Sequence, residues 1–316
     1  MQNLQDMSLN RRHAIAKAAG LALGLVVADA KSAAPIAAVD VTLKLKGHRV
    51  DVHFSAGFAP DLRDQALHWI RQSAQTVASY LGRFPLAHLD LYLRAIDGID
   101  VRGGFTSVER APFVRVNVGR SSGKIQFASD WILVHEMIHL AIPRLERRHN
   151  WLHEGIATYV EGVARTRAGH VAATQFWGEL ATGMPQGLPQ EGDQGLDLTH
   201  TWGRTYWGGA LFCLLADVRM RTATNNQLGL QQALQGVLAA GGSYAVQWPI
   251  ERVLATADRA VGLNPLTDLH REMGPVAMSV DLPALWRELG VEPKSPDVAR
   301  LSNDATKAAV RRAIAE

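Results

Sequence analysis

The sequence predicts an α+β fold in which a small mixed β-sheet lobe is followed by a mostly helical lobe. Residues 39–55 alternate apolar and polar side chains around a Lys46-Gly47-His48 turn, as the two strands of a hairpin do. Residues 89–95 and 113–118 have a similar strand-like composition, whereas apolar residues in the second half of the chain recur at helical spacing. The chain has 316 residues, of which 47% are hydrophobic, so it can bury a substantial core.

The first 34 residues are expected to be an export signal. Arg11-Arg12 precede an apolar, small-residue run at 14–28, and residues 28–30 or 32–34 supply a small-x-small cleavage site. The paired arginines resemble a twin-arginine signal, with an ordinary secretory signal or an amphipathic helix as alternatives. The run is too short and too rich in alanine for a good membrane span. We therefore expect an exported protein, periplasmic or secreted, with no stable membrane insertion after the leader is removed.

The charge and the cysteine content narrow the class of protein further. The formal net charge is +3, and the basic residues are scattered rather than clustered, which argues against a nucleic-acid partner. Cys213 is the single cysteine, so no internal disulfide can form, and its apolar surroundings predict a core position. The sequence carries no signal for an oligomeric state. After the leader, we divide the chain into a β-containing lobe at 36–200 and a helical lobe at 201–316.

The elements follow from local patterns. After the hairpin, residues 60–81 place apolar side chains on one helical face, and Gly103-Gly104-Phe105 is expected to form a bulge. A buried helix is expected to start at Ser129 or Asp130, which can cap it, and to stop at Pro143. Residues 184–198 are rich in glycine and proline and predict a loop. Further helical segments are expected at 151–161, 163–181, 211–221, 227–238, 249–261, 282–289 and 302–315.

The most informative motif is His135-Glu136-Met137-Ile138-His139. Two histidines four residues apart on a helix point the same way, so their imidazoles can bind one cation together. Glu136 follows the first histidine and can lie against a water molecule on that metal. This is the HExxH arrangement of zinc hydrolases, with two ligands and a general base on one helical turn. A chance pentapeptide is the alternative, and a catalytic zinc needs a third protein ligand.

A second motif follows at residues 151–161, which read WLHEGIATYVE. Together with HExxH, the pattern WLxEGxAxYxE resembles the gluzincin (peptidase MA-like) zinc metallopeptidases, especially the aminopeptidase N-like and glycyl aminopeptidase-like catalytic domains. In those families the glutamate before the glycine is the third ligand, which implies one Zn²⁺ held by His135, His139 and Glu154. His149 and His153 are alternative third ligands. The implied fold is a zincin-like, thermolysin-type catalytic domain.

The resemblance also implies residues around the metal. Thr158 follows Glu154 by one helical turn, and Thr158 or Glu161 is expected to orient a ligand imidazole. A solvated helix face is an equal alternative for Glu161. Tyr206 precedes Gly209 by three residues at the head of an apolar helix, as in gluzincin aminopeptidases, whose tyrosine hydrogen-bonds the oxyanion. A fixed neutral donor there lowers the barrier by roughly a few kcal/mol, although a packed aromatic is the alternative reading.

Substrate binding is assigned by resemblance to the segment before the zinc helix. In gluzincins a strand there edges the cleft and pairs with the extended substrate, which implicates Gly103 and Gly104. Aminopeptidase N-like enzymes carry Gly-x-Met-Glu-Asn at this place, and its glutamate binds the free amine of the substrate. This chain has Gly-Gly-Phe-Thr-Ser at 103–107, so Glu109 is the candidate replacement, or else a solvated loop charge.

Together these patterns imply a zinc-dependent peptidase that acts on a peptide or protein substrate. A metal-activated water is expected to attack the peptide bond with Glu136 as general base, and an aminopeptidase is one form this activity can take. A zinc endopeptidase is the alternative within enzymes. A non-catalytic zincin-fold protein that serves as a scaffold or binding partner is the alternative outside them.

Overall fold

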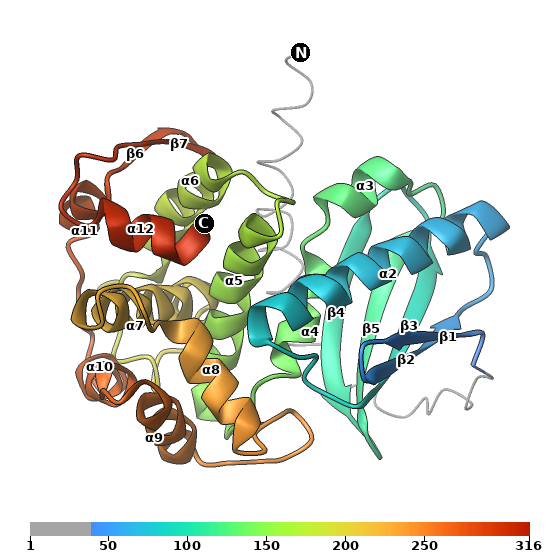
Figure 1. Ribbon diagram of the computed structural model, residues 1–316, viewed down its shortest axis with the longest axis horizontal. Coiled ribbons are helices and arrows are strands. Elements are labelled where there is room, and N and C mark those ends of the chain that lie inside the picture. The colour runs from blue at the N-terminus through green and yellow to red at the C-terminus, as the bar shows by residue number, and fades with distance from the viewer. Residues whose placement is uncertain (1–38) are drawn as a thin grey trace.

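The computed structural model describes residues 39–316, so the predicted export signal lies outside the described residues. A five-stranded sheet covered by the long helix α2 (Pro60–Leu81) forms one side of the molecule, and helices form the other (Figure 1). Helix α4 (Ile132–His139), which carries the HExxH motif, lies between the two sides (Figure 1). The predicted α+β class is confirmed.

The sheet is mixed, as predicted, and has the strand order β1-β2-β3-β5-β4. β1 pairs antiparallel with β2, β2 and β5 each pair parallel with β3, and β4 pairs antiparallel with β5 at the edge. α2 connects the parallel strands β2 and β3, which need such a crossover. The strands are β1 (Val41–Leu45), β2 (His48–Phe54), β3 (His88–Ile96), β4 (Val101–Val108) and β5 (Pro112–Gly119).

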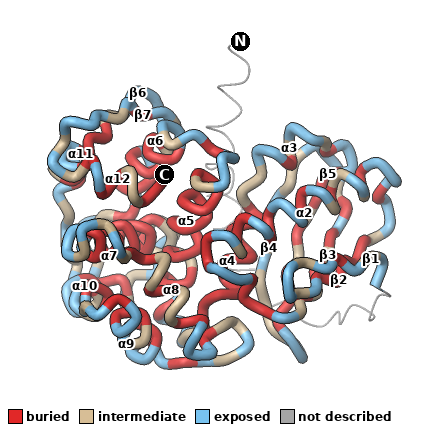
Figure 2. The backbone as a smooth tube through the Cα atoms, in the orientation of Figure 1, coloured by how far each residue is buried: buried red, intermediate tan, exposed pale blue. Residues whose placement is uncertain are grey.

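One hydrophobic core joins the sheet to the helices. The inner face of α2 contributes Ala66, Ile70 and Ala74, none of which is exposed, and the central strands contribute fully buried residues such as Leu91 and Val114. Figure 2 shows buried backbone through α4 and α5 (Asn150–Arg167), with exposed segments around the periphery. The HExxH helix therefore lies inside the molecule, where packing holds its side chains.

Helices α5 and α7 (Gly209–Ala223) pack against each other on the helical side of the molecule. The helix at 282–289 ends where the sequence predicted, whereas the apolar stretch 163–181 is broken at Gly169 (φ +75°) into two helices. The other helices are α3 (Lys124–Ser129), α6 (Ala173–Gly183), α8 (Leu230–Ala239), α9 (Ile250–Val261), α10 (Pro265–Met273), α11 (Leu282–Leu289) and α12 (Ala308–Ala315). A hairpin of β6 (Val291–Ser295) and β7 (Val298–Leu301) accompanies them.

Several local expectations need correction. Ser129 does not cap α4, because it ends the unpredicted helix α3 and its hydroxyl donates to the carbonyl of Gln126. Asp130 alone caps α4, accepting hydrogen bonds from the amides of Ile132 and Leu133. The sequence also gave no sign of α10 or of the β6–β7 hairpin. In residues 39–316, no helix combines the length and the apolar character needed to cross a membrane.

Candidate metal centre and active site

The first turn of α5 faces the HExxH turn of α4, and this brings three potential ligands together. The ligand atoms of His135, His139 and Glu154 all lie within 4.8 Å of one another. Nε2 of His135 is 3.3 Å and Nε2 of His139 is 3.5 Å from the same Oε2 atom of Glu154. Both imidazoles are buried. The residues that the sequence proposed as ligands thus converge on one point from two helices.

The spacing and the charge of this group fit a zinc ion. A tetrahedral zinc with bonds of about 2.0–2.1 Å holds its ligand atoms roughly 3.3–3.4 Å apart, close to the separations found here. Burial raises the pKa of Glu154, but the charge of His139 and the hydrogen bonds of both imidazoles outweigh it and hold that pKa well below its usual range. The site therefore offers two nitrogens and one ionised carboxylate oxygen.

Two other clusters of histidine and aspartate fit hydrogen bonding better than metal binding. Asp197 lies 2.8 Å from Nδ1 of His149 and 2.9 Å from Nε2 of His270, and it also accepts from the indole of Trp151 at 2.8 Å. These separations are those of direct N–H···O bonds. The second of these clusters, Asp51, His88 and Asp90, lies on the sheet and includes a 3.0 Å hydrogen bond between His88 and Asp51. His149, an alternative third ligand, is thus engaged elsewhere.

His153, the other alternative third ligand, contacts the metal centre through the imidazole of His139. Its Nε2 lies 2.7 Å from the carbonyl oxygen of Pro143, which can only accept, so this nitrogen carries a proton. Burial and the charge of His139 lower the pKa of His153 to about 4, so the ring is neutral. Its Nδ1 is then an acceptor, 3.4 Å from Nδ1 of His139. This arrangement places the Nδ1 hydrogen of His139 toward His153 and leaves Nε2, which lies 3.5 Å from Glu154, as the nitrogen that can bind a metal.

Glu136 is held against the edge strand β4. Its carboxylate is buried, and burial raises its pKa to about 7 despite the nearby His139 and a hydrogen bond from Thr106. The Thr106 hydroxyl lies 2.8 Å from Oε2 of Glu136. A Cβ added at Gly104 would lie 2.8 Å from Cγ of Glu136. The predicted bulge is present, since the β4–β5 register shifts between Val101 and Gly104.

Tyr206 lies in a π-helical segment (Arg204–Gly208) directly before α7. π-helical turns occur often at functional sites. The phenol ring stacks with the imidazole of His135 at 6.5 Å between centroids. Burial, followed by the charges of Glu154 and Glu136, raises the pKa of Tyr206 well above its ordinary value. Its hydroxyl is therefore a neutral donor close to both carboxylates.

The residues expected to support a ligand imidazole line a small cavity beside His135. Thr158 and Glu161 border this cavity of about 50 Å³, which is otherwise mostly apolar. Nδ1 of His135 is buried and has no hydrogen-bond partner among the described residues. Glu161 is paired with Arg165 at 2.6 Å. Neither Thr158 nor Glu161 reaches His135 directly. The walls include Trp131, Trp202 and Trp207.

Glu109 lies apart from this site. It is exposed in the turn between β4 and β5, where its amide donates to the carbonyl of Ala111. Its charge adds to the burial that raises the pKa of Tyr92. Gly104, by contrast, lies on β4 against Ile132 and Glu136 of α4, whereas Gly103 is exposed and a Cβ added there would meet only Asn117 of β5. The structure thus brings Gly104 to the site, with Gly103 beside it on the exposed side of the strand, and leaves Glu109 at the end of the hairpin.

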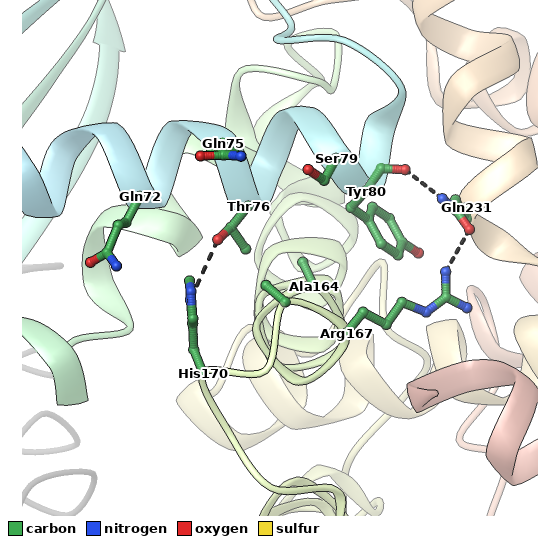
Figure 3. A pocket seen from close by; sticks show the side chains of 10 residues that line it. Gln72, Gln75, Thr76, Ser79, Tyr80, Ala164, Arg167, His170 and Gln231 are labelled. Atoms are coloured by element: carbon green, nitrogen blue, oxygen red, sulfur yellow. Dashed lines mark hydrogen bonds between the residues drawn. The ribbon is translucent and has the colours of Figure 1, made fainter.

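A larger cavity, of about 370 Å³, lies between α2 and the helices α5 and α8 (Figure 3). Neutral polar side chains line most of it, including Gln72, Gln75 and Gln231. Arg167 is committed there to Gln231 and to two main-chain carbonyls of α12. It follows Glu154 by 13 residues on α5, which is about 20 Å of helix. This cavity is separate from the metal centre.

Three contacts of the site had no signal in the sequence. Thr106 and His153 contact Glu136 and His139, and the hydroxyl of Tyr244 donates to the carbonyl of Thr106 at 3.2 Å. Each contact joins segments that are distant in the chain or on different elements. The sequence shows that Thr106 stands where aminopeptidase N-like enzymes have the amine-binding glutamate. It does not show that Thr106 hydrogen-bonds Glu136.

Comparison with known proteins gives a fold but no close relative. No protein-family model matches the sequence, and no curated protein matches it either. Among solved structures, an aminopeptidase N family protein from Idiomarina loihiensis has a TM-score of 0.61 at 15% identity, covering 79% of this chain and 49% of that one. An M1 zinc metallopeptidase from Deinococcus radiodurans has a TM-score of 0.50 at 16% identity, covering 81% of this chain and 53% of its own.

A mutant of the Deinococcus radiodurans M1 enzyme bound to a Tyr-Ser-Ala substrate also matches, with a TM-score of 0.50 at 16% identity, over 77% of this chain and 52% of that one. This chain thus spans about half the length of these structures. At such identities the similarity concerns the fold. The resemblance read from the two motifs is confirmed at that level: the chain has the fold shared by M1 zinc metallopeptidases and aminopeptidase N family proteins.

Proposed function

We propose that this protein is a zinc-dependent peptidase of the gluzincin type, with a zincin-like, thermolysin-type catalytic domain. The observation that carries the proposal is the convergence of His135, His139 and Glu154 on one point, with Glu136 on the same turn of α4. The fold shared with M1 zinc metallopeptidases supports it. A scaffold would need the ligands but not the base and the phenol that accompany them here.

Each residue has a chemical role in this proposal. His135, His139 and Glu154 would hold the zinc ion, which when bound acts as a Lewis acid and lowers the pKa of a water molecule. Glu136 takes the proton of the attacking water and passes it to the leaving amine. Tyr206 donates its phenolic hydrogen to the oxygen that gains negative charge during attack. β4 is an edge strand, so its outward backbone groups can pair with an extended substrate, apart from the carbonyl of Thr106, which accepts from Tyr244.

The charges near the metal centre favour an endopeptidase over a strict aminopeptidase. An enzyme that selects a free terminal amine needs an anion to pair with the ammonium. Residues 103–107 of β4 carry no charge, and Glu109 is exposed in the hairpin turn. Among the described carboxylates beside the metal centre, Glu154 and Glu136 have roles of their own and Glu161 is paired with Arg165. We therefore propose that a blocked amino terminus does not prevent cleavage.

The test uses the purified protein and a peptide library. We expect cleavage that a chelator abolishes and that added zinc restores. Glu136→Gln is expected to keep one zinc per chain while turnover falls about 10²- to 10⁴-fold. The control is Glu146→Gln, which changes an exposed glutamate. Cleavage by Glu136→Gln at the wild-type rate would exclude the proposed base, and cleavage unaffected by chelation would exclude the metal.

A second assay separates the two kinds of peptidase. Matched peptides with free and acetylated amino termini are expected to be cleaved at similar rates and at internal bonds. Release of only the first residue, and only from free termini, would show an aminopeptidase instead.

From residues 1–34 we also propose that the protein is exported to the periplasm or secreted. Mass spectrometry of the native protein tests this, because an intact Met1 on cytoplasmic protein would contradict it.

A further inference from the structure

Thr106 is the described residue whose side chain hydrogen-bonds the carboxylate of Glu136. Its Oγ1 atom lies 2.8 Å from Oε2 of Glu136 and also 2.8 Å from the main-chain oxygen of the same residue. The single hydroxyl hydrogen is shared between these two oxygens, since a carboxylate and a carbonyl oxygen both accept. Thr106 lies on β4 and Glu136 on α4, so this contact joins the edge of the sheet to the HExxH helix.

A second contact from the same strand fixes the other side of the carboxylate. Gly104 precedes Thr106 by two residues, and residues two apart on a strand share a face. A Cβ added at Gly104 would lie 2.8 Å from Cγ and 3.1 Å from Oε1 of Glu136. The carboxylate therefore lies between the bare backbone of Gly104 and the hydroxyl of Thr106. A larger residue than glycine would push it away.

Thr106 is itself held from the helical side of the molecule. The hydroxyl of Tyr244 donates to the carbonyl of Thr106 at 3.2 Å. The segment that carries Tyr244 is tied to the end of the HExxH helix, because the amide of Tyr244 donates to the carbonyl of Leu140 at 3.0 Å. Strand β4 is thus held beside α4 directly, through Thr106 and Glu136, and indirectly, through Tyr244 and Leu140.

We propose that Thr106 is a positioning residue, which orients the carboxylate of Glu136 by its hydroxyl hydrogen bond. This inference rests on the proposed function, in which Glu136 is the general base. A glutamate side chain has several rotatable bonds, and a base must lie within hydrogen-bond reach of the proton it takes. A displacement of about 1 Å in such a group can lower turnover by about 10². The hydroxyl, together with Gly104, restricts the carboxylate to one orientation.

The test compares Thr106→Val, which removes the hydroxyl at nearly constant shape, with Thr106→Ser, which keeps it. Thr106→Val is expected to lower kcat by about 10- to 100-fold, with KM changed less than about twofold and zinc content unchanged. Thr106→Ser is expected to restore most of kcat. Ser107→Ala, the next position on β4, is the matched control and should behave as wild type. Wild-type kcat in Thr106→Val, or no rescue by serine, would overturn the inference.

A measurement independent of turnover separates this inference from the proposed function. Thermal unfolding midpoints of Thr106→Val, Glu136→Ala and the double variant form a cycle. If the hydrogen bond links the two residues, the shifts of the single variants are not additive in the double variant. Additive shifts would overturn the inference, whether or not the protein cleaves peptides. A wild-type protein that cleaves nothing, with a non-additive cycle, would instead contradict the peptidase function alone.

Discussion

Gly155 of α5 and Gly209 of α7 meet backbone to backbone. A Cβ added at Gly155 would overlap the Cα and the carbonyl carbon of Gly209. Glu154 directly precedes the first glycine, and Tyr206 precedes the second by three residues. The close crossing of the two helices therefore sets the distance between the third ligand and the phenol. The glycine of the motif at 151–161 is thus explained by the approach of α7.

Gly155→Ala is expected to damage both stability and zinc binding. The added methyl group must push α7 away, and overpacking of this kind destabilises proteins by about 1–3 kcal/mol. Glu154 would shift with the backbone, so we expect less than one zinc per chain after dialysis. Urea unfolding and elemental analysis measure the two effects. Gly123→Ala is the control, because its Cβ would meet neighbours no closer than 3.7 Å. An alanine variant with wild-type stability and full zinc would disprove this account.

The sequence predicted the parts of the site that depend on local spacing. His135 and His139 share a helical face whatever surrounds them, and the WLHEGIATYVE motif pointed by resemblance to Glu154, whose carboxylate the structure places beside both imidazoles. Helix α2 was also predicted to its end residues, since Pro60 starts it and Gly82 follows it in the left-handed conformation. Such features are decided by neighbours in the chain, and a pattern can therefore reveal them.

Contacts between distant elements could not be predicted in this way. Thr106 reaches Glu136 only because β4 is the edge strand next to β5 and lies beside α4. His153 was read as a possible ligand, because a pattern shows a histidine near the motif but not which way its ring nitrogens point.

Tyr206→Phe is expected to lower turnover while leaving zinc content unchanged. Loss of one donor to a developing oxyanion typically reduces kcat by about 10²–10³. The aromatic ring that stacks with His135 is retained, so the metal centre should keep its structure. Steady-state kinetics and elemental analysis together check this. Unchanged kcat would show that Tyr206 only packs against the site, which was the alternative reading of the sequence.

His153→Ala is expected to weaken zinc binding about 10- to 100-fold, the usual effect of removing a partner of a metal ligand. Without His153, the Nδ1 hydrogen of His139 loses its acceptor, and the ring is free to rotate or to change tautomer. Competition with a chromophoric chelator measures the dissociation constant. His68→Ala removes an exposed histidine and is the control. If the two variants bind zinc equally well, His153 does not orient His139.

Asp197 makes the stability of the protein depend on acid pH. Burial raises its pKa, but hydrogen bonds from His270, Trp151 and His149 outweigh this and hold the pKa well below its ordinary value. The unfolded chain therefore binds this proton more readily than the folded one. The contribution of Asp197 is present above the unfolded pKa, about 3.9, and is lost as the pH falls from there toward the folded pKa.

Asp197→Asn should reveal this contribution by its pH dependence. At pH 7 we expect the variant to be less stable by about 1–3 kcal/mol, because charge-assisted hydrogen bonds to two histidines and Trp151 are weakened. The difference from wild type should shrink as the pH is lowered from 5 to 3, since the wild-type carboxylate then loses its advantage over the unfolded state. Urea unfolding at pH 7, 5 and 3 measures it, with the exposed Asp304→Asn as control. A difference that stays constant over this range, or grows toward acid pH, would show that the carboxylate charge is not what stabilises the cluster.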